Sequence, residues 1–498
     1  MRLSKVMEGT GAAGPLGDDP EIARVTGDSR AVGPGSLFFA IRGGRSDGHA
    51  FAAEAARRGA AAVVAEHPVE CAPALLLLAP STRRAMALAA SNFFGRPGEA
   101  MKLGAVTGTN GKTTVTWLVE ACAGAAGVPS AVMGTVTHRW PGGSRPASHT
   151  TPESTEIAAT LATARDAGAR LAVLEVSSHA LAQERAAGLR FDAAAFTNLT
   201  RDHLDYHGDL EAYFQAKRRL FIDHLDPRGA AVVNAGDAHG TRLARELRAA
   251  GIRAWRYGMT DGVELLAEEP RVGLSGIEAA LATPAGRLRL RSPLVGSHNL
   301  ENLLCAAGLA LALGLPAKSV ELGLAQCTGA PGRLERIEAR GVSAFVDYAH
   351  TDDALSRALA ALRALGPRRL LVVFGCGGDR DRGKRPLMGA AAARGADLAV
   401  VTSDNPRSED PHDIICQIVP GLEHAGLRRI SAARARAGER GYIVVADRRE
   451  AIALAVAAAR PGDAVLIAGK GHEDYQIVGA ERRPFDDREE ARRALGIG

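Results

Sequence analysis

The chain has 498 residues, which at roughly 150 residues per domain predicts about three domains. Hydrophobic residues make up 46% and charged residues 23%, which excludes disorder as the overall state. The formal net charge is only +5, and arginines are mixed with acidic residues along alanine-rich stretches such as 241–250. This pattern indicates solvated helix faces, so we expect no nucleic-acid partner.

The cysteines and apolar runs bear on the cellular compartment. The six cysteines are spread along the chain without a C-x-x-C pair, which favours reduced thiols over a zinc site or a disulfide framework. The aliphatic run 74–79 is too short to cross a bilayer, and residues 1–14 lack the apolar core of a signal peptide. We therefore expect a cytoplasmic chain with no membrane partner.

Short apolar runs alternate with longer helix-compatible segments, which is typical of an α/β fold with mainly parallel sheets. Turn-rich segments near Pro97 and Pro331 predict domains at 1–97, 98–329 and 330–498. We expect a P-loop-type mononucleotide-binding sheet in the central domain and a Rossmann-like sheet in the last. The predicted strands are Ser36–Ile41, Ala61–Ala65, Leu75–Ala79, Leu103–Thr107, Leu171–Val176, Ala193–Phe196, Ala230–Val233, Ala344–Val346, Leu370–Phe374, Leu398–Val401 and Ala464–Ile467.

Many of these strands end in a cluster of Gly, Asn, Asp, His or Thr. In open parallel sheets ligands bind at the carboxyl ends of the strands. Any one cluster could be a turn or a helix cap, but seven of them together predict one large ligand site.

A glycine-rich segment follows the strand predicted at 103–107 and precedes the helix-compatible run 115–124. Glycines let the backbone wrap a phosphate, the lysine can reach the outer phosphates of ATP, and the first threonine can bind Mg²⁺. Val106 stands where the usual pattern has its first glycine, so the loop is a shorter variant. The predicted ATP-binding residues are Gly108, Thr109, Asn110, Gly111, Lys112, Thr113 and Thr114.

Glu175 ends a predicted buried strand, and His203 lies in a polar segment farther along. A carboxylate and an imidazole beside a triphosphate would suit a second metal ion. Taken alone, each has a simpler interpretation, as a capping carboxylate and a loop histidine.

Several segments occur in the order seen in Mur ligases, and the sequence resembles that family over nearly its whole length. They are GDSR (27–30), TGTNGKTT (107–114), EVSSHAL (175–181), NLTRDHLDYHG (198–208), YFQAKRRLF (213–221), HNLENLLCA (298–306), GRLER (332–336), DYAHTDDAL (347–355), GCGGDRDRGKRP (375–386), DNPR (404–407) and GKGHEDYQ (469–476). Two positions depart from the family pattern: His149 stands where Asn is frequent, and Asp352 where Pro is common.

The resemblance is strongest to members that add meso-2,6-diaminopimelate to UDP-N-acetylmuramoyl-L-alanyl-D-glutamate in peptidoglycan precursor synthesis, a step needed for cell-wall growth, cell shape and division. It implies that ATP and Mg²⁺ convert the free carboxylate of the muramoyl dipeptide into an acyl phosphate, which the amine of diaminopimelate attacks. Positioning and charge neutralisation then dominate catalysis.

The resemblance also assigns residues. It implies that Lys217 is carbamylated by CO₂ and binds metal together with Thr113, Glu175 and His203, and that the catalytic set is Lys112, Lys217, Glu175 and His203. Further nucleotide contacts are implied at Asn299, Arg333 and Asp347. For the UDP-linked substrate the implied residues are Ser29, Thr150, Thr151, Ser177, Gln183 and Arg185.

The DNPR segment bears on the amino acid. An arginine can bind the distal carboxylate of diaminopimelate through two hydrogen bonds, whereas a lysine pocket has no use for it. The implied pocket residues are Arg380, Asp404, Asn405, Pro406, Arg407, Gly469 and Glu473.

Other functions stay open on the sequence alone. The chain could be a sibling ligase for another amino acid or for D-Ala-D-Ala, or a folate polyglutamylating enzyme. It could also be an ATP-driven switch, which would hydrolyse ATP without an acceptor, or an inactive scaffold. We expect a monomer.

Overall fold

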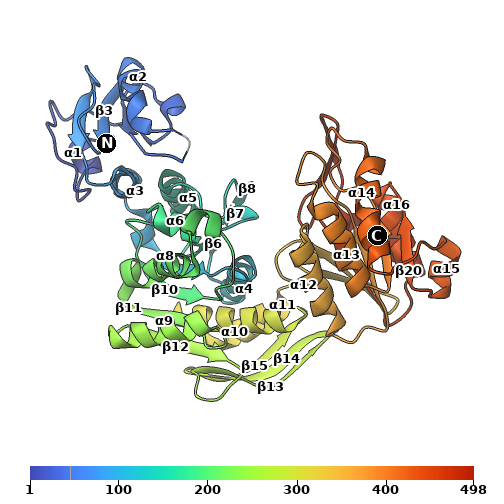
Figure 1. Cartoon of the computed structure of the whole chain (residues 1–498). Coiled ribbons are helices and arrows are strands. Elements are labelled where there is room, and N and C mark those ends of the chain that lie inside the picture. Colours follow the sequence, from blue (N-terminus) through green and yellow to red (C-terminus); the bar gives the residue numbers. More distant parts are fainter. Residues whose placement is uncertain (45, 498) are drawn as a thin grey trace. The chain divides into compact units, whose positions relative to one another are not determined.

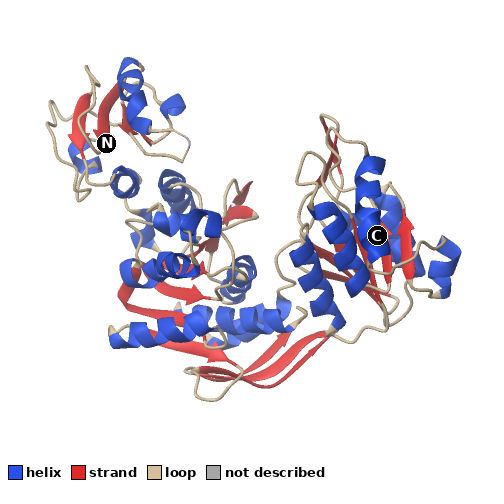
Figure 2. Ribbon diagram, in the orientation of Figure 1, coloured by secondary structure: helices blue, strands red, loops and turns tan. Residues whose placement is uncertain are grey.

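The computed structural model describes residues 1–44 and 46–497. They divide into two compact units, one of residues 1–267, 281–288 and 301–324, the other of residues 268–280, 289–300 and 325 onward. Helices and strands alternate through both units (Figures 1 and 2), which confirms the predicted α/β class. Within the described ranges no helix is long and apolar enough to cross a membrane.

The amino-terminal part holds a parallel four-stranded sheet in the order β1-β2-β3-β4. Its strand β2, with the sequence SLFF, is buried throughout because both faces of the sheet are covered. The elements are α1 (Leu3–Val6), β1 (Arg24–Thr26), η1 (Ser29–Ala31), β2 (Ser36–Phe39), η2 (Gly48–Phe51), α2 (Ala52–Arg57), β3 (Ala60–Ala65), β4 (Leu75–Leu78) and α3 (Thr82–Phe93).

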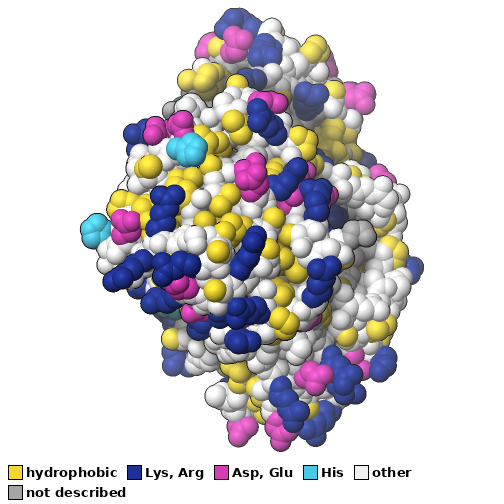
Figure 3. Space-filling view, turned by 90° about the vertical axis from the view of Figure 1, so that its right-hand side faces the viewer, with side chains coloured by type: hydrophobic (Ala, Val, Ile, Leu, Met, Phe, Trp, Pro, Cys, Tyr) yellow, Lys and Arg dark blue, Asp and Glu magenta, His cyan; other side chains and the backbone are white. Residues whose placement is uncertain are grey.

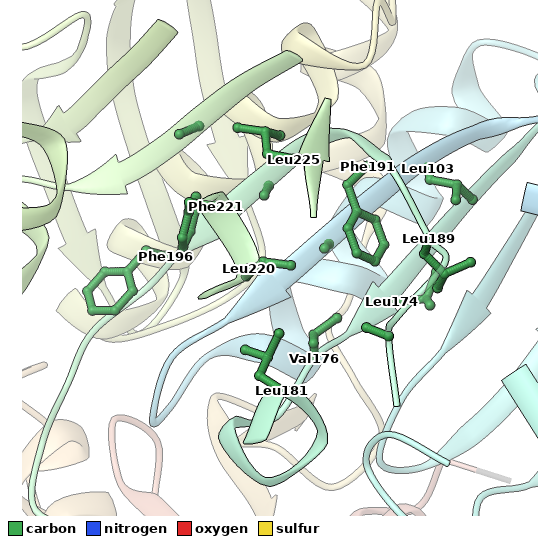
Figure 4. Packing of buried hydrophobic residues seen from close by; sticks show 14 of the residues in the cluster. Leu103, Leu174, Val176, Leu181, Leu189, Phe191, Phe196, Leu220, Phe221 and Leu225 are labelled. Atoms are coloured by element: carbon green, nitrogen blue, oxygen red, sulfur yellow. The ribbon is translucent and has the colours of Figure 1, made fainter. Parts of the chain in front are cut away.

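An 11-stranded sheet follows in the order β15-β14-β13-β12-β11-β10-β5-β9-β6-β7-β8. Its middle strands β11, β10, β5, β9 and β6 are parallel, and alanine, leucine and phenylalanine side chains from them pack with helix α8 (Figure 4). The strands are β5 (Lys102–Thr107), β6 (Ser130–Met133), β7 (Thr137–Trp140), β8 (Gly143–Pro146), β9 (Leu171–Glu175), β10 (Phe191–Phe196), β11 (Leu225–Asn234), β12 (Arg253–Gly258), β13 (Leu265–Gly273), β14 (Gly276–Thr283) and β15 (Gly286–Ser292). The helices are η3 (Pro97–Ala100), α4 (Lys112–Ala125), α5 (Ser154–Asp166), α6 (Ser178–Ala182), α7 (Leu204–His207), α8 (Leu210–Asp223), α9 (Ala238–Ala249), α10 (Ser297–Ala312) and α11 (Ala317–Gln326).

The carboxyl-terminal sheet has the order β16-β17-β21-β18-β19-β20 and is parallel except for its edge strand β16. Apolar clusters cover both faces. The strands are β16 (Glu335–Ala339), β17 (Val342–Asp347), β18 (Leu370–Phe374), β19 (Leu398–Val401), β20 (Gly441–Val444), β21 (Ala464–Ala468), β22 (Tyr475–Val478) and β23 (Glu481–Pro484). The helices are α12 (Asp352–Arg363), α13 (Lys384–Gly395), α14 (Pro411–His424), α15 (Ala432–Ala437), α16 (Arg448–Ala458) and α17 (Asp487–Leu495).

Every predicted strand is present, with ends that differ by a few residues. The prediction missed several strands at the sheet edges, including β7 and β8, which pair in antiparallel fashion. It also missed β13, β14 and β15, and the inner strands β6 and β12 of the 11-stranded sheet. On the molecular face drawn in Figure 3, Lys and Arg side chains are interspersed with acidic and apolar side chains.

Candidate functional site

The predicted phosphate loop connects β5 to α4. Gly108 and Gly111 have φ angles of +144° and +89°, which side chains other than glycine rarely adopt. A Cβ at Gly108 would collide with Thr197 Oγ1, and one at Gly111 with Asn302 Oδ1. The two glycines therefore satisfy both the backbone conformation and the tight packing of this loop.

The segment after β10 holds the phosphate loop in place, because β10 pairs directly with β5. Thr197 Oγ1 donates to the carbonyl of Asn110 at 2.5 Å. Asn198 accepts from the N–H of Asn110 through its side chain at 3.0 Å and from the N–H of Thr109 through its carbonyl at 2.8 Å. Thr197 and Asn198 were not among the predicted site residues, although both lie in a polar cluster at the end of a predicted strand.

Two lysines donate to one carbonyl oxygen of this loop. Lys112 Nζ lies 2.9 Å from the carbonyl oxygens of Gly108 and Thr109, and Lys217 Nζ lies 2.8 Å from that of Gly108. The Lys217 side chain is buried, on the inner face of α8. Burial and, to a smaller extent, the charge of Lys112 hold the pKa of Lys217 well below its ordinary value.

Glu175 forms a buried hydrogen-bonded node at the end of β9. Its Oε2 accepts from Thr113 Oγ1 at 3.0 Å and from Thr135 Oγ1 at 2.9 Å, while Oε1 accepts from the N–H of Thr135 at 2.9 Å. Gly134 lies so close that a Cβ there would collide with the carboxylate. The structure thus brings Glu175 to the first turn of α4, next to the predicted Mg²⁺ ligand Thr113.

His203 lies apart from this node, in a cluster of rings. It precedes α7 with φ at +52°, is about half exposed, and its ring lies 4.8 Å from that of His179 and 6.1 Å from that of Tyr213. Lys217 Nζ lies 4.4 Å from the centre of the same Tyr213 ring. Tyr213 therefore lies between His203 and Lys217, the two predicted metal ligands that do not contact Glu175.

Within residues 1–44 and 46–497, no three His, Cys, Asp or Glu side chains gather into a metal-binding group. Magnesium commonly takes one or two protein oxygens and completes its shell with phosphate oxygens and water. The Thr113 hydroxyl and Glu175 carboxylate, 3.0 Å apart, are oxygen donors of this kind and fit the predicted ion.

The residues predicted to hold the muramoyl dipeptide lie together beside Glu175. Thr151 Oγ1 donates to the carbonyl of Glu175 at 2.8 Å and accepts from the N–H of Ser177 at 2.9 Å. Arg185 donates to the carbonyl of Thr151 at 2.7 Å and to Gln183 Oε1 at 2.8 Å. Thr150 contacts Thr135 at 3.1 Å between hydroxyl oxygens, which connects this group to the Glu175 node.

Ser29 begins η1 and lines a separate cavity of about 600 Å³ in the same unit. The lining also includes Asp28, Arg30, Arg83 and Glu153, which supply both signs of charge. Arg30 is already paired with Asp28 at 2.9 Å.

The predicted amino-acid pocket lies in the second unit, after β19 and β21. Asn405 Nδ2 donates to Glu473 Oε2 at 3.0 Å, and Gly469, at φ +124°, lies against Asp404. Arg407 has φ +52° and donates to the carbonyl of Gly378 at 2.8 Å. Arg380 lies in a third loop, after β18, and its side chain is exposed. Pro406 lies in the loop after β19, with its carbonyl packed against Gly378 of that third loop.

The three other predicted nucleotide contacts also belong to the second unit. Asp347 ends β17 and accepts from the N–H groups of Leu334 and Ala349 at 2.8 and 2.9 Å, and burial raises its pKa. The Arg333 guanidinium lies 5.3 Å from the centre of the Tyr348 ring. Asn299 Nδ2 donates to the carbonyl of Val295 at 2.8 Å.

The two departures from the family pattern have simple local settings. His149 is exposed and contacts Ser148 Oγ at 3.1 Å. Asp352 begins α12, where a negative charge is favourable, after the N-cap Thr351.

Comparison with known proteins supports this description. Residues 21–93, 106–310 and 332–471 match the Mur ligase family catalytic domain, the Mur ligase middle domain and the Mur ligase glutamate ligase domain, respectively. A UDP-N-acetylmuramoyl-L-alanyl-D-glutamate–2,6-diaminopimelate ligase of Geobacter metallireducens is 46% identical and aligns over 99% of this chain and 97% of its own. The enzyme of the same name from Parasynechococcus marenigrum is 49% identical over 96% and 95% of the two chains.

A solved structure of a ligase with this name is 34% identical and has a TM-score of 0.74, covering 100% of this chain and 99% of its own. The strand, glycine-rich loop and helix at 102–125 define a mononucleotide-binding fold of the P-loop type. The chain belongs to the Mur ligase family, whose members are ATP-dependent ligases.

Proposed function

We propose that this protein is the ATP-dependent ligase that joins meso-2,6-diaminopimelate to UDP-N-acetylmuramoyl-L-alanyl-D-glutamate in peptidoglycan precursor synthesis. Relatives that carry this name are 46% and 49% identical over nearly the whole chain, which supports the assignment. The proposed division is residues 1–97 for the UDP sugar, 98–329 for ATP and 330–498 for the amino acid. The proposed enzyme is a cytoplasmic monomer.

One feature of the first unit carries the proposal. A continuous chain of hydrogen bonds runs from Thr113 on α4 through Glu175 and Thr151 to Arg185. It places the phosphate loop beside a hydroxyl- and arginine-lined group that suits a carboxylate. Transfer of a phosphoryl group from ATP to a carboxylate needs this proximity.

The proposed reaction begins when the free carboxylate of the D-glutamyl residue attacks the γ-phosphate of ATP and releases ADP. The amine of diaminopimelate then adds to the acyl carbon, and phosphate leaves as the amide forms. Lys112 neutralises phosphate charge, and the N–H groups at the start of α4 bind phosphate oxygens. Arg185, Gln183, Ser177, Thr150 and Thr151 orient the muramoyl dipeptide.

Magnesium is part of the proposal, with Thr113 and Glu175 as its principal ligands in this chain. When bound, it neutralises the charge of the phosphate oxygens. Lys217 is proposed to be carbamylated, because its buried amine is readily deprotonated and only a neutral amine captures CO₂. His203 is proposed as a further ligand close to Lys217.

Ser29 and its cavity are proposed to hold the uridine end of the substrate, and Asn299, Arg333 and Asp347 to contact the nucleotide. Arg407, with Arg380, Asp404, Asn405, Pro406, Gly469 and Glu473, is proposed to bind diaminopimelate. A guanidinium matches the carboxylate that distinguishes this amino acid from lysine.

The test is a ligation assay followed by mass spectrometry. Purified protein, Mg-ATP and UDP-N-acetylmuramoyl-L-alanyl-D-glutamate are incubated in parallel with meso-diaminopimelate, with L-lysine and without an amino acid. We expect a tripeptide product and ADP release with diaminopimelate only. Product with lysine would overturn the amino-acid assignment, and ATP hydrolysis that ignores both acceptors would overturn the ligase assignment.

A further inference from the structure

Lys470 is a fully buried lysine between the two loops proposed to bind the amino acid. Its Nζ lies 2.9 Å from Asn405 Oδ1, 2.7 Å from the carbonyl oxygen of Tyr475 and 3.3 Å from Asp404 Oδ1. An ammonium group has three protons to donate, and here three oxygens surround it. The lysine therefore joins the loop after β19 to the segment that follows β21.

The contact with Asn405 fixes the orientation of that side chain. An ammonium and a backbone N–H can only donate, and both Lys470 Nζ and the N–H of Ile477, at 2.9 and 3.0 Å, face the same Asn405 atom. That atom must be the amide oxygen. The amide nitrogen then points at Glu473 Oε2, 3.0 Å away, and holds the carboxylate as an acceptor.

Lys470 also supplies the charge that the two acidic groups need. Asp404 Oδ1 is buried without a hydrogen-bond donor among the described residues, and it forms an ion pair with the Lys470 ammonium at 3.3 Å. Glu473 Oε2 lies 3.8 Å from the same ammonium. Buried carboxylates are costly unless they are paired, so the Lys470 ammonium is the positive charge that compensates both of them.

A second buried cation, Arg448, holds the backbone of the same two loops. Arg448 forms two hydrogen bonds of 2.7 Å with Asp487, both fully buried, and donates to the carbonyls of Ser403 and Ala468. Arg448 thus fixes the backbone just before Asp404 and Gly469, whereas Lys470 contacts the side chains themselves.

We propose that Lys470 is a positioning residue for the incoming amino acid: it orients Asn405 and holds the Asp404 and Glu473 carboxylates side by side so that they receive an ammonium group of the substrate. This inference rests on the proposed function. The pocket has a negative part, formed by Asp404 and Glu473, and a positive part, formed by Arg407. Lys470 arranges the negative part. The Lys470 ammonium donates its hydrogen bonds to oxygens of the protein, so Lys470 does not itself bind the substrate.

The test compares Lys470→Met and Lys470→Gln with the wild type in steady-state ligation, with Lys318→Met as the control. Lys318 is an exposed lysine on α11 that pairs with Glu321. We expect the Lys470 variants to raise the KM for diaminopimelate at least ~10-fold, with kcat changed less than ~3-fold and the KM for ATP less than ~2-fold. A loss of kcat at saturating diaminopimelate with unchanged KM would overturn the inference, because it would make Lys470 part of the chemistry.

A double variant distinguishes positioning from general support of the fold. Lys470→Met combined with Glu473→Gln removes one charge of each sign, so we expect it to melt at a higher temperature than Lys470→Met alone. Its KM for diaminopimelate should rise by less than the product of the two single effects, because the two charges act on each other. Independent, multiplying effects on KM would contradict the proposed coupling, and they can be measured even if Lys470→Met folds poorly.

The wild-type substrate tests the proposed function, and the KM of the Lys470 variants tests the inference, so the two can fail separately. If the wild type ligates L-lysine instead of diaminopimelate, the proposed substrate is wrong, and the Lys470 comparison is made with the KM for lysine. If the wild type ligates diaminopimelate and the Lys470 variants keep its KM, the inference alone is wrong.

Discussion

The buried amine of Lys217 donates a 2.8 Å hydrogen bond to the carbonyl oxygen of Gly108, the first glycine of the phosphate loop. Lys112 donates to the same oxygen from the other end of that loop. Helix α8 therefore contacts the phosphate loop through Lys217 and through Tyr213, whose hydroxyl lies 3.3 Å from Thr109 Oγ1, although the helix lies about a hundred residues farther along the chain. Two positive groups on one oxygen also favour loss of a proton from the buried one.

We predict that Lys217 carries a carbamate in the active enzyme. Burial and the neighbouring Lys112 lower the pKa of Lys217, so more of its amine is neutral near pH 7 and able to capture CO₂. The measurement is ¹³C NMR after equilibration with labelled bicarbonate, where a carbamate resonance should appear in the wild type and vanish in Lys217→Ala. Ligation by Lys217→Ala should fall at least ~100-fold, and an unlabelled, fully active wild type would contradict the prediction.

Replacing Glu175 by Gln should test its proposed charge. The amide keeps an oxygen for the N–H of Thr135 but removes the negative charge next to Thr113. We expect kcat/KM to fall at least ~100-fold, equivalent to about 2.7 kcal/mol, and the Mg²⁺ concentration for half-maximal rate to rise. Glu120→Gln, which alters only an ion pair with Arg139, is the control and should stay within ~2-fold of wild type in rate.

Gly108, in the phosphate loop, and Gly124, near the end of α4, should respond differently to substitution by alanine. Gly108→Ala puts a Cβ onto Thr197 at φ +144°, so ATP affinity measured by calorimetry should fall at least ~10-fold. Gly124, inside α4, has no atom within 4 Å of an added Cβ, so Gly124→Ala should keep that affinity and stabilise the fold by about 0.5–1 kcal/mol. Equal ATP affinity in both variants would refute the loop assignment.

Arg407→Met should weaken diaminopimelate selectively. Loss of a guanidinium–carboxylate contact should raise the KM for diaminopimelate about 10- to 100-fold, a cost of about 1.4–2.7 kcal/mol. Activity with lysine, however low, should change much less because lysine lacks the distal carboxylate. Arg483→Met, an exposed arginine paired with Glu481, is the matched control and should leave both activities unchanged.

His224 predicts a pH dependence of stability. Burial lowers its pKa to about 4 in the folded chain, so between about pH 6.5 and 4 the unfolded chain binds a proton that the folded one does not. The free energy of unfolding is therefore unaffected by His224 above pH 6.5. It decreases by an amount on the order of 3 kcal/mol as the pH falls from 6.5 to 4. Denaturant titrations from pH 7 to 5 should show a shallower loss of the free energy of unfolding for His224→Gln than for the wild type.

Most of the central strands could be predicted because each is a continuous apolar run between turn residues, as in Leu370–Phe374. Strand β15, with the sequence GRLRLRS, was missed because only every second residue is buried, so no run of apolar letters marks it. Alternation at a period of two was the signal that would have found it.

The phosphate loop could be predicted because strand, loop and helix are contiguous in sequence. Thr197 and Asn302 could not, because their approach to Gly108 and Gly111 depends on which strands and helices pack side by side. Lys217 shows the same limit: QAKRRL favours a surface lysine, and only the packing of α8 against the sheet buries it.

The two borders of the 11-stranded sheet have a consequence for the behaviour of the protein at high concentration. At one border β15 presents Arg287, Arg289 and Arg291 on its exposed positions, and at the other β8 is four residues long and ends in Pro146. Charge on one border and a missing N–H donor on the other both discourage a foreign strand from extending the ladder. Both features oppose edge-to-edge pairing of this sheet, and we expect neutral substitutions along β15 to weaken that protection.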